Sequence, residues 1–356
     1  MPLLTPASGL DSDPNMLADR LSSYADSLRA RMNDLFDVAP GLEPFYGMMA
    51  YHLGWVDENF QPNNARAGKN LRPSLCILLG DALGAAPATI IPFAAGIELL
   101  HNFSLIHDDI QDQSPTRRGR PTVWTLWSPA QAINAGDGMF SLAHLAWLRS
   151  DLAERDARAF TAIVRSLELT ILRLCEGQYL DMSGEGSLDI SSEAYMRMIG
   201  RKTAALIGEA AWVGARTATS DGGVLDAART FGHELGIAFQ IRDDVLGIWG
   251  DEQKTGKSAS SDIATRKMTL PIIVALESAS SAVRDELRMR YGSAPSADSD
   301  QRIRELLDMA NAEAISTGQE ERRWQSAMQA LDDIPMTMQW REAIRSYARS
   351  FVGRRE

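Results

Sequence analysis

Residues 90–112 have the sequence IIPFAAGIELLHNFSLIHDDIQD, a long apolar run that ends in three aspartates. Apolar side chains dominate from Phe93 to Ile106, and a helix that is apolar nearly all round belongs in the interior of a protein. Its polar residues gather at the carboxyl end. This stretch therefore predicts a buried helix that presents acidic side chains at one end.

The helical pattern recurs on both sides of this stretch, without a succession of short alternating strands. We find no repeat and no linker long enough to separate two domains. The sequence predicts a single all-α domain over residues 16–356, after a flexible leader rich in Pro, Ser and Asp over residues 1–15. Helices are expected at residues 16–38, 71–83, 90–110, 130–152, 157–180, 193–217, 223–248, 270–276, 300–315, 320–331 and 339–352.

Composition narrows the functional classes. The chain has 356 residues, of which 45% are hydrophobic, and 36 basic against 47 acidic side chains give a net charge of −11. Such an acidic protein is poorly suited to bind nucleic acid. Its two cysteines do not indicate a disulfide framework, no uninterrupted apolar run reaches the roughly 18 residues of a membrane helix, and the N-terminus lacks the layout of a signal peptide. We expect a cytoplasmic protein without a transmembrane segment.

The acidic helix end carries the first indication of chemistry. Asp108 and Asp112 are four residues apart, so their carboxylates are neighbours on one helix face. Like charges at this spacing repel, and partial burial strengthens the repulsion. A hard divalent cation would turn this repulsion into a binding site, and Mg²⁺ prefers a few carboxylates together with phosphate oxygens. The alternative is a solvated acidic helix end, which the preceding apolar run disfavours.

A second acidic pair, Asp243 and Asp244, follows another largely apolar helix. Gln240 lies three residues before Asp243 and is therefore its neighbour on that helix face. Two aspartate clusters on buried helices suggest a cavity with metal ions bridging its walls.

Basic residues gather close to these acidic clusters and in the loops between helices. In an acidic protein this arrangement suggests capture of an anion, because Arg offers planar bidentate contact to phosphate. Salt bridges between the arginines and the aspartates are the alternative, and spacing alone does not separate the two. The basic residues are Lys69, Arg72, Arg117, Arg118, Arg120, Lys202 and Lys257.

Taken together, these residues resemble the trans-isoprenyl diphosphate synthases, the family of farnesyl and geranylgeranyl diphosphate synthases. The resemblance covers residues 68–271, and its pieces occur in the family's order. The pieces are Gly68-Lys-x-x-Arg-Pro73, His101, Asp108-Asp-x-x-Asp112, Arg117-Arg-Gly-x-Pro121, Ala135-Gly-Asp137, Gly177-Gln-x-x-Asp181, Lys202-Thr203, Phe239-Gln-x-x-Asp-Asp244, Gly256-Lys257 and Lys267-Met-Thr-Leu-Pro271.

The resemblance implies an all-α fold of the isoprenoid synthase type with a central cavity, usually in a homodimer. It implies Mg²⁺-dependent, head-to-tail condensation of isopentenyl diphosphate with an allylic diphosphate: dimethylallyl, geranyl or farnesyl diphosphate. By analogy, Asp108, Asp112 and Asp243 would bind Mg²⁺, and Asp109 and Asp244 would support those ligands.

The resemblance also assigns roles to the basic and polar residues. Arg117, Lys202 and Lys257 would hold the allylic diphosphate. Thr203 and Gln240 would place oxygen atoms near the allylic cation, so they are grouped with Lys202 as catalytic. The isopentenyl diphosphate would contact Lys69, Arg72, His101 and Arg118, while Lys267 would contact substrate and Arg354 or Arg355 could close over the site.

Two features refine this expectation. The family's second motif usually ends in a third aspartate, which here is Gly247, so metal affinity or the reaction itself could differ. In the family, the residues four and five before the first aspartate help to form the floor of the chain pocket, and here they are Ser104 and Phe103. Since Ser104 is small and Phe103 limits depth, we expect geranylgeranyl diphosphate (C20) ahead of farnesyl diphosphate (C15).

Two other functions fit the same scaffold. A terpene cyclase or another diphosphate-processing enzyme is favoured by Gly247 but would not need the basic residues assigned to isopentenyl diphosphate. A non-catalytic partner subunit of another prenyltransferase predicts loss of the metal-binding residues, whereas all five aspartates of the two motifs are present.

Overall fold

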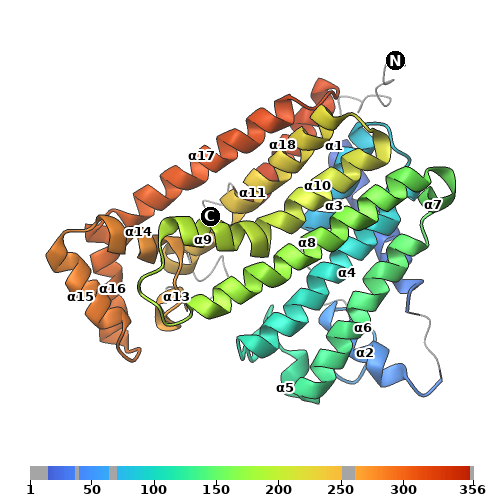
Figure 1. Ribbon diagram of the computed structural model, residues 1–356. Coiled ribbons are helices and arrows are strands. Elements are labelled where there is room, and N and C mark those ends of the chain that lie inside the picture. The colour runs from blue at the N-terminus through green and yellow to red at the C-terminus, as the bar shows by residue number, and fades with distance from the viewer. Residues whose placement is uncertain (1–14, 37–39, 64–69, 251–260, 353–356) are drawn as a thin grey trace. The chain divides into compact units, whose positions relative to one another are not determined.

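The computed structural model describes residues 15–36, 40–63, 70–250 and 261–352 (Figure 1). Within these ranges nearly all regular structure is helical, and the one sheet is a short hairpin, so the predicted all-α class is confirmed. The elements up to α7 are α1 (Asn15–Asn33), α2 (Glu43–His52), α3 (Leu71–Ala82), α4 (Pro87–Gln111), β1 (Thr116–Arg117), β2 (Arg120–Pro121), α5 (Val123–Trp127), α6 (Pro129–Leu148) and α7 (Leu152–Arg155).

The second half of the chain continues the pattern with longer helices. A π-helical turn, η1, lies between α9 and α10. The elements are α8 (Ala157–Gly184), α9 (Ser192–Ile199), η1 (Gly200–Ala204), α10 (Ala205–Ala218), α11 (Gly222–Trp249), α13 (Ser261–Ala264), α14 (Leu270–Ser278), α15 (Ser281–Tyr291), α16 (Ala297–Met309), α17 (Ala312–Asp332) and α18 (Met338–Val352).

The contacts divide the chain into two compact units. The first comprises Met1–Val164 and Val213–Ser220, and the second comprises Arg165–Trp212 and Asp221–Glu356. Helices α8 and α10 contribute residues to both units. The single domain expected over residues 16–356 stays a prediction.

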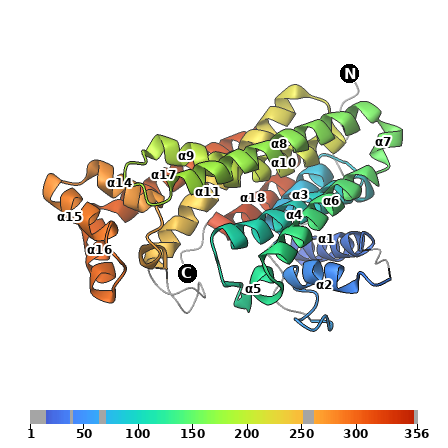
Figure 2. The same ribbon diagram turned by 60° about the horizontal axis from the view of Figure 1, so that its bottom comes forward.

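In the first unit, α4 is the central helix and packs against α6, α3 and α1 (Figure 2). Phe93 and Ile97 on α4 are completely buried, as the apolar sequence of this helix predicts. A Cβ atom built on Gly96 would lie 1.9 Å from Nε1 of Trp147 on α6. A glycine is therefore required where the two helices approach each other.

Helix α4 is also long and apolar enough to cross a membrane. Of its most apolar stretch, however, 72% is buried among other parts of the protein, as in a core helix that packs inside a protein.

In the second unit, α11 packs against α17, η1, α14 and α18. The face that α11 turns to this core includes Ile237, Ile241 and Ile248. A Cβ atom on Gly236 would lie 2.6 Å from Cα of Ala204 in η1, so this glycine also permits close packing of backbone. The carboxyl half of α11, which carries the second aspartate pair, is thereby fixed against η1.

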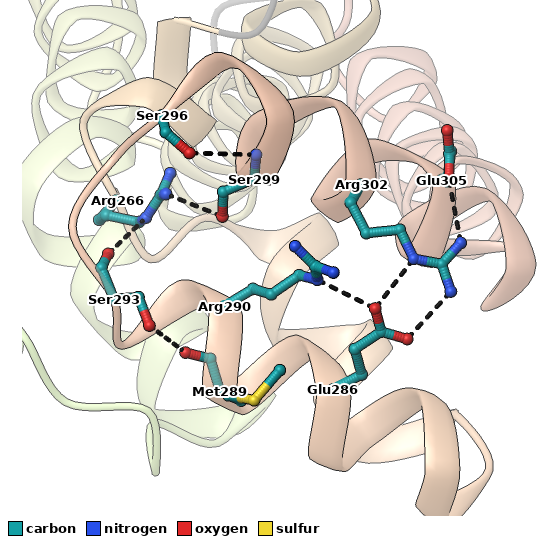
Figure 3. A network of polar contacts seen from close by, with 9 residues as sticks. All are labelled: Arg266, Glu286, Met289, Arg290, Ser293, Ser296, Ser299, Arg302 and Glu305. Carbon is teal, nitrogen blue, oxygen red and sulfur yellow. Dashed lines mark hydrogen bonds and ion pairs between the residues drawn. The ribbon is translucent and has the colours of Figure 1, made fainter.

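Helices α15 and α16 of the second unit are joined by a surface ion-pair network (Figure 3). Glu286 accepts hydrogen bonds of 2.9 Å from Nε of Arg290 and from Nε and Nη2 of Arg302. The two arginines lower the pKa of Glu286 to about 2. Arg302 also donates to Glu305, so one guanidinium connects two carboxylates.

The structure departs from the predicted helices at several points. The helix predicted at 300–315 is wrong, because Asn311 takes a left-handed conformation (φ 53°) that separates α16 from α17. The segment predicted as one helix at 193–217 contains the π turn η1. The short helices α2, α5 and α7, the helix α15 and the hairpin were not predicted.

Candidate active site

The first aspartate cluster occupies the carboxyl end of α4 as predicted. Asp108 lies in the last turn, and the backbone N–H of Asp112 closes the helix on the Asp108 carbonyl at 2.8 Å. Asp109 is buried, with 2% of its surface exposed, whereas Asp112 is exposed. The two carboxylates proposed as ligands therefore flank a third that points into the protein.

A hairpin after α4 brings Arg117 to the buried Asp109. Arg118 (φ 54°) and Gly119 (φ 76°) form the two-residue turn between β1 and β2, as in type I′ hairpins. Nε and Nη2 of Arg117 each lie 2.8 Å from Oδ1 of Asp109. Burial raises the pKa of Asp109, while Arg117 opposes the rise. The salt-bridge alternative considered from the sequence is thus confirmed for this pair.

Arg72 and His101, both expected at the isopentenyl diphosphate, lie together in the first unit. Nη1 of Arg72, on α3, is 3.1 Å from Nε2 of His101 on α4. Burial, followed by the charges of Arg72, Arg118 and Arg117, lowers the pKa of His101 well below its usual value. Because a guanidinium can only donate, Nε2 of the neutral imidazole accepts this hydrogen bond.

The hairpin arginines also line a small pocket with Tyr51, His52 and Asp109. Arg120 is occupied structurally, since its Nη1 and Nη2 donate to the carbonyls of Tyr51 (3.0 Å) and Val56 (2.9 Å). Arg118 makes no hydrogen bond or ion pair with the described residues, although its charge influences Glu98, His52 and His101. Arg118 is thus the hairpin arginine best placed to bind an anion.

In the second unit, Thr203 and Gln240 lie together as the sequence suggested. The Thr203 hydroxyl is 2.9 Å from Oε1 of Gln240, and Nε2 of Gln240 donates to Oδ1 of Asp244 at 3.1 Å. Since the Gln240 amide nitrogen is directed at a carboxylate, its oxygen faces Thr203 and accepts a hydrogen bond from the Thr203 hydroxyl. The lone pairs of the Thr203 oxygen are left for other contacts.

Asp244 is the buried centre of this network. Its Oδ2 accepts hydrogen bonds from the hydroxyl of Tyr195 and from the backbone N–H of Leu270 (3.2 Å). Burial raises the pKa of Asp244 to about 6, although Tyr195, the charge of Lys267 and Gln240 favour the ionised form. Both of its oxygens are engaged, whereas the neighbouring Asp243 is exposed.

Lys202 and Thr203 both belong to the π turn η1, a feature that often marks functional sites. Nζ of Lys202 lies 2.5 Å from Oδ2 of Asp181 on α8. A Cβ atom on Gly177 would lie 2.3 Å from the backbone nitrogen of Lys202. The glycine on α8 therefore permits the close approach that forms this ion pair.

The donors at the end of α4 suit a hard cation such as Mg²⁺. Besides the neighbouring Asp108 and Asp112, the buried Oδ2 of Asp109 has no hydrogen-bond partner among the described residues. Carboxylate oxygens are the ligands Mg²⁺ prefers. Within either described unit, no three carboxylate, imidazole or thiolate side chains gather closely enough to hold an ion alone. A cation here would need further oxygens from substrate or water.

Phe103 and Ser104, expected at the floor of the chain pocket, lie one to two turns before Asp108. The Phe103 ring is 5.0 Å from that of Phe140 on α6 and 4.9 Å from that of His107. The Ser104 hydroxyl donates to the carbonyl of His101 at 2.8 Å. Phe103 thus belongs to an aromatic cluster between α4 and α6.

Several predicted contacts cannot be placed, and several residues were missed. Lys69, Lys257, Arg354 and Arg355 lie outside the described residues. The sequence reasoning did not find Tyr195, which binds Asp244, or His52, which lines the arginine pocket. The buried Glu98, which accepts a 2.8 Å hydrogen bond from Asn102, was not singled out either. No local motif distinguishes these residues, because their partners are distant in sequence or lie on a helix that carries no recognisable motif at that point.

Comparison with known proteins identifies the family. The sequence model of the family described as "Polyprenyl synthetase" matches residues 54–310 of this chain. The chain belongs to this family. As a polyprenyl synthetase family member it is a prenyltransferase, which confirms the resemblance noted in the sequence.

Individual relatives agree with this assignment. The chain is 38% identical over 292 residues to a geranylgeranyl diphosphate synthase of Mycobacterium tuberculosis, a match that covers 82% of each protein. It is 42% identical over 242 residues to a (2E,6E)-farnesyl diphosphate synthase of Mycobacterium bovis, covering 68% of this chain and 65% of that protein. The crystal structure of a polyprenyl synthetase from Streptomyces coelicolor superposes with a TM-score of 0.84 at 34% identity, covering 96% of this chain and all of the other.

Proposed function

We propose that this prenyltransferase condenses isopentenyl diphosphate with an allylic diphosphate to give a short-chain trans-prenyl diphosphate, with geranylgeranyl diphosphate preferred over farnesyl diphosphate. The observation that carries the proposal is the end of α4, where neighbouring aspartates adjoin the cluster of Arg72, His101 and Arg118. Acidic and basic residues side by side suit a diphosphate that is bound partly through a cation and partly through arginine.

Asp108, Asp112 and Asp243 are proposed to hold Mg²⁺. When bound, Mg²⁺ would stabilise the negative charge that develops on a departing diphosphate. Asp109 would keep Arg117 in place, since its Oδ1 accepts two of that guanidinium's N–H groups. Asp244 would do the same for Gln240.

The remaining residues are proposed to bind and orient the substrates. The Nε2 atom of His101 accepts a hydrogen bond from Arg72, and the Arg72 guanidinium would bind the isopentenyl diphosphate with Lys69 and Arg118. Lys202, Lys257 and Arg117 would contact the allylic diphosphate, and Lys267 would also contact substrate. The Thr203 hydroxyl donates a hydrogen bond to Gln240, so its oxygen would direct lone pairs toward the allylic cation.

The preference for a C20 product rests on Phe103 and Ser104. The Phe103 ring is buttressed by Phe140 and His107, so it would act as a firm floor, whereas Ser104 leaves space beside it. Relatives of this chain include synthases named for both C20 and C15 products.

A homodimer in the cytoplasm completes the proposal. Support for the dimer comes from α8, where Leu169, Leu172, Tyr179 and Met182 are exposed. Their spacing places them along one helix face, and an exposed apolar stripe marks a surface suited to protein association.

The experiment is an incubation of purified protein with Mg²⁺, isopentenyl diphosphate and each allylic diphosphate in turn, read by mass spectrometry before and after phosphatase treatment. We expect prenyl diphosphates longer than the starter, mainly C20. Asp108→Ala should lose most turnover, and Asp26→Ala, which removes an exposed carboxylate on α1, should not.

Other outcomes would overturn the proposal. Release of hydrocarbon or alcohol without consumption of isopentenyl diphosphate would indicate a cyclase. Absence of any turnover would indicate a partner subunit, and full turnover by Asp108→Ala would refute the role of that aspartate.

A further inference from the structure

Arg266 lies where the chain turns from α13 to α14, at a position that usually belongs to glycine. Its backbone is left-handed (φ 55°), a conformation that the Cβ atom of an L-residue disfavours. The N–H of Arg266 donates to the Ile263 carbonyl and the N–H of Lys267 to the Asp262 carbonyl, each at 3.0 Å. These two bonds form the Schellman motif that ends a helix, in which the left-handed residue is commonly glycine. A residue with a side chain keeps this conformation only where surrounding contacts hold it.

The side chain of Arg266 makes such contacts (Figure 3). Its Nη1 donates to the Ile263 carbonyl and, at 2.7 Å, to Oδ1 of Asp300 on α16. Longer contacts join its Nε to the Ser293 carbonyl (3.3 Å) and its Nη2 to the Ser299 hydroxyl (3.5 Å). Only 14% of the Arg266 side chain and 20% of that of Asp300 is exposed, so solvent screens this ion pair weakly. One guanidinium thus ties the end of α13 to α16.

Tyr291, at the end of α15, supports the same turn. Its ring belongs to the core of the second unit, and the guanidinium carbon of Arg266 lies 5.6 Å from the ring centroid. The Tyr291 hydroxyl donates to the backbone carbonyl of Lys267. Burial raises the pKa of Tyr291, so the hydroxyl keeps the proton that makes this bond. With its N–H on Asp262 and its carbonyl on Tyr291, the backbone of Lys267 is fixed on both sides.

The side chain of Lys267 is exposed and extends from this fixed backbone. Its charge favours the ionised form of Asp244, so its ammonium group lies near the second aspartate pair. Three residues further on, the N–H of Leu270 donates to Oδ2 of Asp244 at 3.2 Å. Because a lysine side chain is a flexible four-carbon stem, the backbone that carries it limits where its ammonium group can reach.

We propose that Arg266 and Tyr291 are positioning residues that act through Lys267 and set where its ammonium group meets a substrate diphosphate. The inference rests on the proposed function, in which Lys267 contacts substrate. Glycine could make this turn without side-chain contacts, whereas arginine couples the turn to α15 and α16. The ion pair of Glu286 with Arg302 joins those two helices, so the residues that support Lys267 form one connected cluster.

The first measurement follows diphosphate binding without turnover. Isothermal titration calorimetry would record the binding of inorganic diphosphate to the full-length protein at a fixed, saturating concentration of Mg²⁺. Lys267→Ala removes a charged donor and should weaken binding about tenfold. Tyr291→Phe removes only the hydroxyl on the Lys267 carbonyl, and Arg266→Gly removes the side chain but permits the left-handed turn. Each of these two should weaken binding about threefold or more.

A double-mutant cycle then shows whether the two residues act through Lys267. In the Lys267→Ala background, Tyr291→Phe and Arg266→Gly should change diphosphate affinity by less than about twofold, because the group that they position is absent. A merely structural role would lower the affinity by the same factor in both backgrounds.

Two control variants match these changes. Tyr24→Phe also removes a buried hydroxyl, which binds Asp81 in the first unit, and it should lower stability without changing diphosphate affinity. Arg288→Gln removes a partly exposed guanidinium of α15 that pairs with Asp189, and it should leave the affinity unchanged.

The outcomes separate this inference from the proposed function. Diphosphate affinities of Tyr291→Phe and Arg266→Gly within about twofold of the unsubstituted protein would overturn the inference. Equal losses with and without Lys267, or an unchanged affinity of Lys267→Ala, would overturn it as well. If Arg266→Gly does not fold, Tyr291→Phe decides alone. If the affinities follow the expected cycle but no prenyl transfer occurs, the proposed function fails and the positioning role stands.

Discussion

The substitution Gly177→Ala tests whether the π turn η1 must lie against α8 for activity. The added Cβ atom would lie 2.3 Å from the backbone nitrogen and 2.7 Å from Cα of Lys202. Both obstacles are backbone atoms, so no side-chain rotation relieves the contact. An ordinary van der Waals contact of a Cβ atom begins at 3.4 Å, whereas this Cβ atom would lie 2.3 Å from the Lys202 nitrogen. Helix α8 and η1 must therefore separate by the difference, about 1.1 Å.

This displacement has two expected costs. Overpacking of a close interface typically costs about 1–3 kcal/mol of stability. A misplacement of about 1 Å at a catalytic site can lower the rate about 100-fold. Because η1 carries Lys202 and Thr203, we expect turnover of Gly177→Ala to fall about 100-fold while the protein remains folded at 25 °C.

The assay pairs urea unfolding with steady-state prenyl transfer, and two glycines of the second unit are controls. Gly222 has open space around its Cβ position, so Gly222→Ala should keep both stability and rate. On Gly232 a Cβ atom would lie 2.6 Å from the carbonyl oxygen of Ile207, away from Lys202 and Thr203. Gly232→Ala should therefore lose stability with a smaller loss of turnover. Normal turnover in Gly177→Ala would refute the reasoning.

Three further predictions follow from the described contacts. Phe103→Ala should lengthen the product, because the ring fills space between α4 and α6; an unchanged product distribution by mass spectrometry would show that another residue sets the length. Arg302→Gln should raise the pKa of Glu286 from about 2 toward 4.5, as followed by NMR of the carboxyl carbon, since it removes a guanidinium that binds the carboxylate. Burial raises the pKa of Glu98 in the folded protein above its value in the unfolded chain. Ionised Glu98 therefore destabilises the fold increasingly as the pH rises from the unfolded pKa through the folded one. Glu98→Gln should therefore gain more stability at pH 8 than at pH 4 in urea unfolding, and an equal effect at both would contradict this account.

The sequence was sufficient for the helical class and for most long helices because their apolar periodicity is strong. It was insufficient at the break between α16 and α17, where Asn311 adopts a left-handed conformation that periodicity does not register. Short elements such as α5 and the hairpin carry too few residues to show a period. The pairing of Thr203 with Gln240 could be anticipated because both occurred in motif pieces.

Contacts that depend on three-dimensional packing were beyond the sequence. Tyr195 binds Asp244 from 49 residues away, and Asp262 reaches Gly247 from another helix. The ion pair of Arg117 with Asp109 was one of two alternatives, and spacing could not choose between them. Anion capture and salt bridging are in fact compatible, since one guanidinium has five N–H donors and Asp109 accepts two of them.

The doubled aspartate of each motif has a common physical explanation. Successive residues on an α-helix point about 100° apart, so two adjacent side chains cannot both face the same space. In each pair the second member, Asp109 or Asp244, has only 2% of its surface exposed, while Asp243 is exposed and Asp108 is partly exposed. The buried carboxylate holds a neighbouring polar residue in place, Arg117 in one case and Gln240 in the other. In the proposed function the more accessible carboxylate would bind a cation, so the pair would divide support and binding between adjacent positions of one helix.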